Sequence, residues 1–193
     1  MPDGPGQDAS ALRILRSIHP PQDTSMNELL RKAFNDQIAL EQASARAYRQ
    51  LSIWAEAHDY TGSATWLASQ AVEETEHADI FIDHVLDRGG DVVLQSLDAP
   101  VATFASLVEV FQTALSHEEK VTASIGDLYA MAQSEGDFRS IPLLTNFLEE
   151  QVAEEAAART IIAELRMVSE SRSATLMLDR ELPGRRGQTP EGV

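Results

Sequence analysis

The stretch from Leu67 to Val85, LASQAVEETEHADIFIDHV, decides the fold expected for this chain. Its apolar residues recur every three or four positions, which is the spacing of one face of an α-helix. Glu74 stands in the middle of that face, and His77 follows one turn later. A carboxylate and an imidazole in the core-facing stripe of a long helix predict a buried polar site between helices.

The same helical spacing extends over four long segments of the chain. Ser25 and Ser106 each precede a glutamate by three residues, which is the capping-box pattern of a helix start, and Pro142 suits the first turn of another helix. Glycines lie at predicted helix ends, where this residue is common. The predicted helices cover residues 26–58, Ser63 to the Gly89-Gly90 stop, 106–134 and 140–168. At about 1.5 Å per residue, helices of this size are roughly 40–50 Å long and are typical of a four-helix bundle.

The connections between these helices predict the topology. Short turns join the first helix to the second and the third to the fourth, so each pair is antiparallel. Residues 91–105 lack helical spacing, and at ~3.3 Å per residue they are long enough to return along the bundle. We therefore expect an all-α bundle with one long crossover and a short fifth helix at 174–182. Residues 25–183 form the predicted domain, 1–24 a flexible N-terminal extension and 184–193 a disordered tail.

Composition excludes several classes of function. Lys and Arg number 15 against 31 Asp and Glu, so the formal net charge of −16 repels a nucleic-acid backbone. The chain has no cysteine, which excludes disulfides, thiolate zinc sites and iron–sulfur clusters. No run approaches the ~18 apolar residues that span a bilayer. We expect a cytoplasmic protein that binds neither nucleic acid nor membranes, and any metal site in it must use carboxylate and imidazole ligands.

A ligand-type side chain interrupts the core face of every predicted long helix. These residues lie within a few positions of their helix midpoints, so a bundle of equal helices brings them to one level. They are Glu41 in the first helix, Glu74 and His77 in the second, Glu118 in the third, and Gln151 with Glu154 in the fourth.

Each of these residues alone has an ordinary structural explanation. A glutamate three residues before a histidine arises about once by chance in such a composition and is usually a surface pair, and a single Glu41 or Glu118 is usually a snorkelling side chain. Four carboxylates at one buried level are different, because their desolvation without a counter-charge costs many kcal/mol. Two metal ions would neutralise them, and oxygen donors with one imidazole favour iron or manganese.

The chain resembles the ferritins, and specifically the bacterial non-haem ferritins, over about residues 26–182. The resemblance rests on five motifs: Ile38-Ala39-Leu40-Glu41 with Tyr48, Glu73-Glu74-Thr75-Glu76-His77, Ser116-His117-Glu118, Glu150-Gln151-Val152-Ala153-Glu154 and Leu178-Asp179-Arg180-Glu181-Leu182. It implies a hollow shell of twenty-four subunits that oxidises Fe(II) with O₂ or H₂O₂ at a di-iron centre and stores ferric mineral, without haem.

The resemblance also implies roles for individual residues. Glu41 and His77 would hold the first iron, Glu74 would bridge, and Glu118 with Glu154 would hold the second. Gln151 would lie near the oxygen-binding side, and Tyr48 would be a hydrogen-bonding, redox-active neighbour. Glu73 and Glu150 match two ligands of a third iron position.

Three positions depart from the family patterns. Ala153 occupies the place of the remaining third-site carboxylate, which predicts a weak or absent third site. Asn146 stands where these ferritins commonly have a tryptophan, which leaves the source of a further electron open. Thr75 replaces the haem-ligating methionine of bacterioferritins and Gln151 the start of their second Glu-x-x-His motif, which disfavours that subfamily.

Two alternatives to iron storage remain at this stage. A di-iron oxidase or oxygenase on the same bundle would act on an organic substrate, and a second Glu-x-x-His motif would have favoured it. A helical interaction module without metal leaves the four mid-helix carboxylates unexplained. A DNA-protecting mini-ferritin is disfavoured because its ligands normally lie across a dimer interface, whereas this chain carries a complete set.

Overall fold

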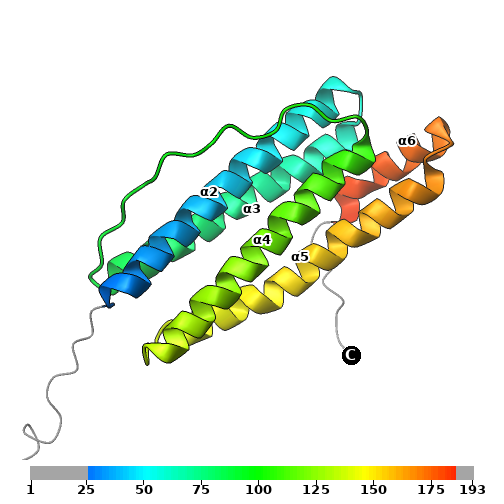
Figure 1. Ribbon diagram of the computed structural model, residues 1–193. Helices are drawn as coiled ribbons and strands as arrows, with labels where there is room; N and C mark the ends of the chain where they lie inside the picture. Colours follow the sequence, from blue (N-terminus) through cyan, green and yellow to red (C-terminus); the bar gives the residue numbers. More distant parts are fainter. Residues whose placement is uncertain (1–25, 186–193) are drawn as a thin grey trace, which may run out of the picture.

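A computed structural model describes residues 26–185, in which α-helices are joined by turns and one long connection, with no strand in that range (Figure 1). The elements are α2 (Glu28–Ala57), α3 (Thr61–Asp87), α4 (Leu107–Ser134), α5 (Ile141–Val168), α6 (Arg172–Glu181) and the short 3₁₀ helix η1 (Leu182–Arg185). The predicted all-α fold is confirmed. No helix in the described range is long and apolar enough to cross a membrane. The predicted extension at 1–24 lies outside the described residues.

The helix ends differ from the predicted ends by a few residues. The N-cap of α2 is Asn27, whose side-chain oxygen accepts a hydrogen bond from Leu30 N at 2.8 Å, and not Ser25 as the capping-box pattern predicted. Ser106 caps α4 as predicted, since its Oγ accepts from Glu109 N at 3.2 Å. The tail predicted to begin at Gly184 is corrected at its start, because η1 continues to Arg185. Residues 186–193 lie outside the described range.

The four long helices pair as the turn lengths predicted (Figure 1). α2 packs along α3, α4 packs along α5, and α2 also contacts α4. No such close backbone approach joins α3 to α5 in the described part of the chain. The connection between α3 and α4 runs in extended form along α2, and Asn35 on α2 accepts a hydrogen bond from Val93 N at 2.8 Å. The single long crossover is therefore confirmed.

The core of the bundle is divided along its length. One apolar cluster fills the end near the start of α2, with Leu30, Phe34, Phe81 and Leu144 among its members. A second fills the opposite end, around Trp66, and includes Leu178 of α6 and Leu182 of η1. The buried glutamates Glu41, Glu74 and Glu118 lie on the stretches of helix between these clusters. Apolar packing at both ends thus holds the polar level in place and supplies the hydrophobic stabilisation that this level lacks.

The short helix α6 fastens the second end of the bundle by capping α3. No side chain of the preceding turn caps that helix. Instead the buried carboxylate of Asp179 accepts hydrogen bonds from Gly62 N at 3.0 Å, from Ser63 N at 2.7 Å and from Ser63 Oγ at 2.6 Å. A Cβ at position 62 would lie 1.8 Å from the carbonyl oxygen of Asp179, so only glycine permits this approach.

Candidate metal centre

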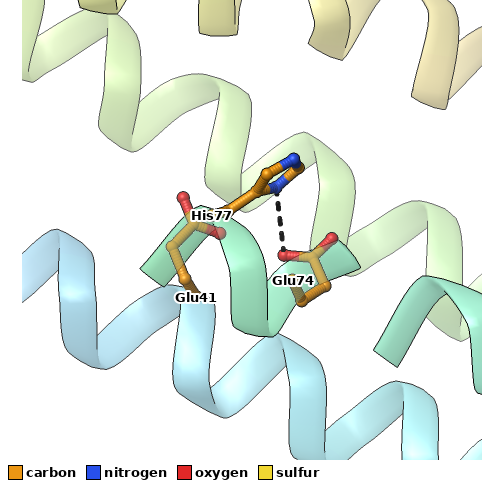
Figure 2. Close-up of side chains that lie close together, drawn as sticks. All are labelled: Glu41, Glu74 and His77. Atoms are coloured by element: carbon orange, nitrogen blue, oxygen red, sulfur yellow. Dashed lines mark ion pairs between the residues drawn. The ribbon is translucent and has the colours of Figure 1, made fainter. Parts of the chain in front are cut away.

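The first half of the candidate site lies between α2 and α3. Glu41 is fully buried, and Glu74 and His77 are 3% and 5% exposed. Figure 2 shows the three side chains converging, Glu41 from α2 and the other two from successive turns of α3. One ligand atom from each lies within 4.8 Å of the others, and His77 Nδ1 is 3.9 Å from Glu74 Oε2. The predicted i, i+3 pair and the glutamate of the neighbouring helix are therefore brought together.

Two carboxylate oxygens of this half have no hydrogen-bond partner among the described residues. They are Glu41 Oε2 and Glu74 Oε2, and both are buried. The other Glu41 oxygen accepts a hydrogen bond from Gln37 Nε2 at 2.7 Å. A buried carboxylate oxygen without a partner carries a large desolvation cost, which a bound cation offsets. The donor set of two carboxylates and one imidazole suits a divalent transition metal such as Fe(II).

The second half of the site, on α4 and α5, is held by hydrogen bonds. Glu118 is buried, and Tyr48 on α2 donates its hydroxyl to Glu118 Oε1. Gln151 Nε2 donates to Glu118 Oε2 at 3.0 Å. Both oxygens of Glu118 are therefore oriented by neighbours, and each retains a further lone pair for a cation.

Glu154 faces the same level from α5 but is only half-buried. Its Oε2 accepts a hydrogen bond from Gln70 Nε2 at 3.2 Å, and the same amide nitrogen lies 3.1 Å from Glu73 Oε2. Gln70 thus links α3 to α5 on the side where these two helices stand apart. This contact places the last predicted carboxylate at the rim of the level and not in its centre.

A second group of ligand-type atoms lies beside the first. Glu73, His77 and Glu150 each offer one atom within 4.8 Å of the others, and His77 Nε2 is 3.6 Å from Glu150 Oε1. Glu150 is 42% exposed and Glu73 is half-buried, so this group opens toward the surface. Ala153 contributes no donor, as predicted. His77 therefore faces the buried group with one ring nitrogen and the more exposed group with the other.

Burial and mutual repulsion raise the pKa values of the buried carboxyls. Burial and the charges of Glu118 and Glu41 raise the pKa of Glu74 to about 11. Burial likewise raises the pKa values of Glu41 and Glu118. Burial and the charges of Glu73 and Glu118 raise the pKa of Glu154 to about 7. Without a cation, the site therefore keeps protons at neutral pH that a metal ion would displace.

His77 carries the one raised histidine pKa in the described range. Burial acts to lower this pKa, but the neighbouring carboxylates of Glu150 and Glu41 outweigh burial and raise it. In return, His77 lowers the pKa of Glu150. These carboxylates thus favour the protonated form of the imidazole.

Supporting residues were missed by the sequence reasoning. Gln37 orients Glu41 and accepts a hydrogen bond from Ser124 Oγ at 2.5 Å, which ties α2 to α4. Gln70 was also missed. A glutamine in the core-facing stripe of a helix does not by itself indicate a functional role. The available signal was spacing: Gln37 and Gln70 each lie one turn before a predicted ligand.

Comparison with known proteins finds relatives of this chain. A family model for ferritin-like domains matches residues 31–168. A bacterial non-heme ferritin of Staphylococcus aureus strain MRSA252 is 32% identical over 157 residues, which are 81% of this chain and 95% of that protein. Its counterpart in Staphylococcus epidermidis is 31% identical over 160 residues, which are 83% of this chain and 96% of that protein.

Solved structures of ferritins are also similar to this chain. An open pore ferritin from the hyperthermophilic archaeon Archaeoglobus fulgidus superposes with a TM-score of 0.82 at 35% identity, covering 84% of this chain and 99% of that one. A humanized archaeal ferritin gives a TM-score of 0.82 at 35% identity, covering 84% and 98% of the two chains. The similarity extends over the bundle that carries the candidate centre.

Proposed function

The chain belongs to the ferritin-like family, and on that basis we propose that it stores and detoxifies iron by oxidising Fe(II) at an intrasubunit di-iron centre. Fe(II) and O₂ or H₂O₂ are then its substrates, and the ferric product leaves to a mineral core. The observation that carries the proposal is the pair of buried, unpartnered oxygens of Glu41 and Glu74 beside His77. A bundle core that only packs apolar side chains would not explain these two buried carboxylate oxygens.

Each half of the site has its own part in this proposal. Glu41 and His77 hold the first iron ion, and Glu74 bridges toward the second. Glu118 and Glu154 hold the second ion, while Tyr48 and Gln151 fix the orientation of Glu118. Iron binding displaces the protons that the buried carboxyls hold because their pKa values are raised, so binding releases protons to solvent. Glu73 and Glu150 are proposed to form a weaker third position at the exposed side.

We further propose a closed shell of twenty-four subunits in the cytoplasm. The names of its relatives support the ferritin function, and the intrasubunit site leaves the outer faces of the bundle available for assembly. Shells built by repeating one subunit contact follow closed point-group symmetry. The cytoplasmic location stays a prediction.

Two measurements on the purified protein test this function. Stopped-flow mixing with two Fe(II) per subunit in air should give rapid formation of Fe(III) followed by a ferric core at higher loading. Size exclusion should give an assembly of about 500 kDa, twenty-four chains of 21.1 kDa. A small oligomer that oxidises Fe(II) but forms no core would instead support an oxidase or oxygenase acting on an organic substrate.

A further inference from the structure

Tyr48 connects the candidate metal centre to a second oxidisable side chain that the proposed ligand set does not use. Its hydroxyl donates to Glu118 on one side. On the other side its ring lies 6.5 Å from the ring of Trp66, centroid to centroid, with the planes at 63°. Tyr48 is 1% exposed and Trp66 5% exposed, so both rings lie inside the bundle.

We propose that Trp66 is an electron donor to the iron centre and that its electron passes through Tyr48. This inference rests on the proposed ferroxidase function and assigns to Trp66 a role in it. The chain has two tryptophans, Trp54 and Trp66, and position 146 carries an exposed asparagine. Trp54 contacts the rings of His58, Tyr60 and Phe104 near the end of the bundle. Trp66 is the one that contacts Tyr48.

Electron counting shows that such a donor completes the reaction where a single Fe(II) ion meets H₂O₂. Two Fe(II) ions reduce O₂ to H₂O₂ with uptake of two protons, and cleavage of the O–O bond requires two more electrons. One Fe(II) supplies the first of these and Trp66 the second, so that H₂O₂, Fe(II), the indole and one proton give Fe(III), a neutral indole radical and two water molecules. The oxidised indole gives up its N–H proton, and solvent supplies the other.

The path between the two rings has a defined order. Tyr48 is oxidised first, because its hydroxyl touches the ligand carboxylate of Glu118, and its proton moves along that hydrogen bond. Trp66 then returns an electron and a proton to Tyr48. The next neighbour of Trp66, Phe111 at 5.5 Å between centroids, is not readily oxidised, so the path ends at the indole. A later Fe(II) ion reduces the Trp66 radical, with uptake of one proton.

Freeze-quench electron paramagnetic resonance tests this path. Wild-type protein is mixed with one Fe(II) per subunit and H₂O₂ in an excess over iron, with unlabelled or with ring-deuterated tryptophan. We expect an organic radical whose hyperfine structure changes with the deuterated label. Trp66→Phe should abolish the label-dependent part, and Tyr48→Phe should abolish it as well. Trp54→Phe, a matched loss of a tryptophan that is 8% exposed, should leave it unchanged.

A second readout uses wild-type protein alone and so does not depend on a variant that folds. With H₂O₂ in excess, the hole on the indole is not refilled, and peptide mass spectrometry should find added oxygen at Trp66 well above that at Trp54. The two side chains have nearly equal exposure, so accessibility does not explain such a difference. Thermal melts of the variants show that each is folded when its radical is measured.

The outcomes separate this inference from the function on which it rests. Normal Fe(II) oxidation with a radical that ignores both the label and Trp66→Phe would overturn the role of Trp66 and leave the ferroxidase function standing. Equal oxidation of Trp66 and Trp54 would also overturn it. Wild-type protein that oxidises no Fe(II) would overturn the proposed function and this inference with it.

Discussion

The α2–α3 half of the centre and the α4–α5 half carry similar carboxylates but hold them in different ways. In the first half, Glu41 and Glu74 each keep one buried oxygen without a hydrogen-bond partner. In the second half, both oxygens of Glu118 accept hydrogen bonds, and Glu154 lies half-buried against Gln70. Free lone pairs in a rigid, dry position favour cation binding more than lone pairs already satisfied by neighbours.

This difference predicts an order of binding. A divalent cation should enter the α2–α3 half first, because there it meets Glu41, Glu74 and the imidazole of His77 within 4.8 Å of one another. The second ion must then share the oxygens of Glu118 with Tyr48 and Gln151. The proposed bridging role of Glu74 makes this residue the link between the two halves.

Glu74→Gln should have the largest effect, because it removes the proposed bridging ligand and so weakens both halves. We expect the initial rate of Fe(II) oxidation to fall by more than about 100-fold, the upper end of the loss seen when only outer-sphere partners of a metal are removed. The fold should stay intact, since glutamine has the size and shape of the protonated Glu74 side chain that the metal-free site holds at neutral pH. Stopped-flow absorbance with two Fe(II) per subunit measures the rate.

Glu76→Gln is the matched control for this variant, because Glu76 lies two residues further on α3 and is exposed. It should oxidise Fe(II) at the wild-type rate. An unchanged initial rate in Glu74→Gln would show that Glu74 is not a ligand of the centre. The two halves would then not be linked through this residue.

The stabilisation of the folded protein by an inert divalent ion distinguishes the α2–α3 half of the centre from the α4–α5 half. A cation that binds only the folded protein should raise its free energy of unfolding by ~2.7 kcal/mol at one hundred times the dissociation constant. At low Zn(II), Glu41→Gln should lose this stabilisation, whereas Glu154→Gln should keep most of it. Thermal melts at known metal occupancy make the measurement. Equal losses in the two variants would show that neither half binds first.

Much of this site follows from the sequence because helices are regular. Residue spacing on a helix fixes which side chains share a face, and equal helix lengths bring the midpoints together. Glu41, Glu74 and His77 could therefore be predicted to meet before any coordinates were known. Their role as iron ligands stays a prediction.

The sequence did not reveal the contacts that depend on side-chain rotamers between helices. The hydrogen bond from Ser124 to Gln37 and the contact of His77 with Glu150 join residues on different helices, and their spacing in the sequence carries no signal. The N-cap of α3 was missed for a related reason, since Asp179 comes from a helix more than one hundred residues later. Local capping patterns describe only partners that are close in the chain.

The stability of the metal-free protein should fall as pH rises, and Glu154 makes part of that fall measurable. Burial and the charges of Glu73 and Glu118 raise its pKa to about 7 in the folded protein. The unfolded chain has an ordinary glutamate pKa near 4.3 and so loses its proton first. The folded state then binds more protons than the unfolded state, and its stability decreases between about pH 4.3 and 7.

Urea unfolding of metal-free wild type and Glu154→Gln at several pH values measures this contribution. The variant should lose less stability over that window, because its side chain does not titrate. His77, whose pKa is also raised, contributes the same sign in both proteins. Parallel pH profiles for the two proteins would show that Glu154 is solvated like a surface carboxylate.

Ala153→Glu should have the smallest effect and extends the comparison to the exposed third position. Glu73, His77 and Glu150 already offer three atoms there, but Glu150 is 42% exposed and His77 is committed to the buried ion once that ion is bound. Two carboxylates alone give a third ion too few donors, and a glutamate at the half-buried position 153 supplies another. The number of strongly bound Zn(II) ions in an equilibrium titration should then rise from two per subunit to three. The O₂ consumed per iron should also change, since a third Fe(II) can add its electron.

Ala157→Glu, an equal change one turn later at an exposed position of α5, should leave both quantities at their wild-type values. A third strongly bound ion in the wild-type protein would show that Glu73, His77 and Glu150 suffice, and that His77 binds a metal through both ring nitrogens.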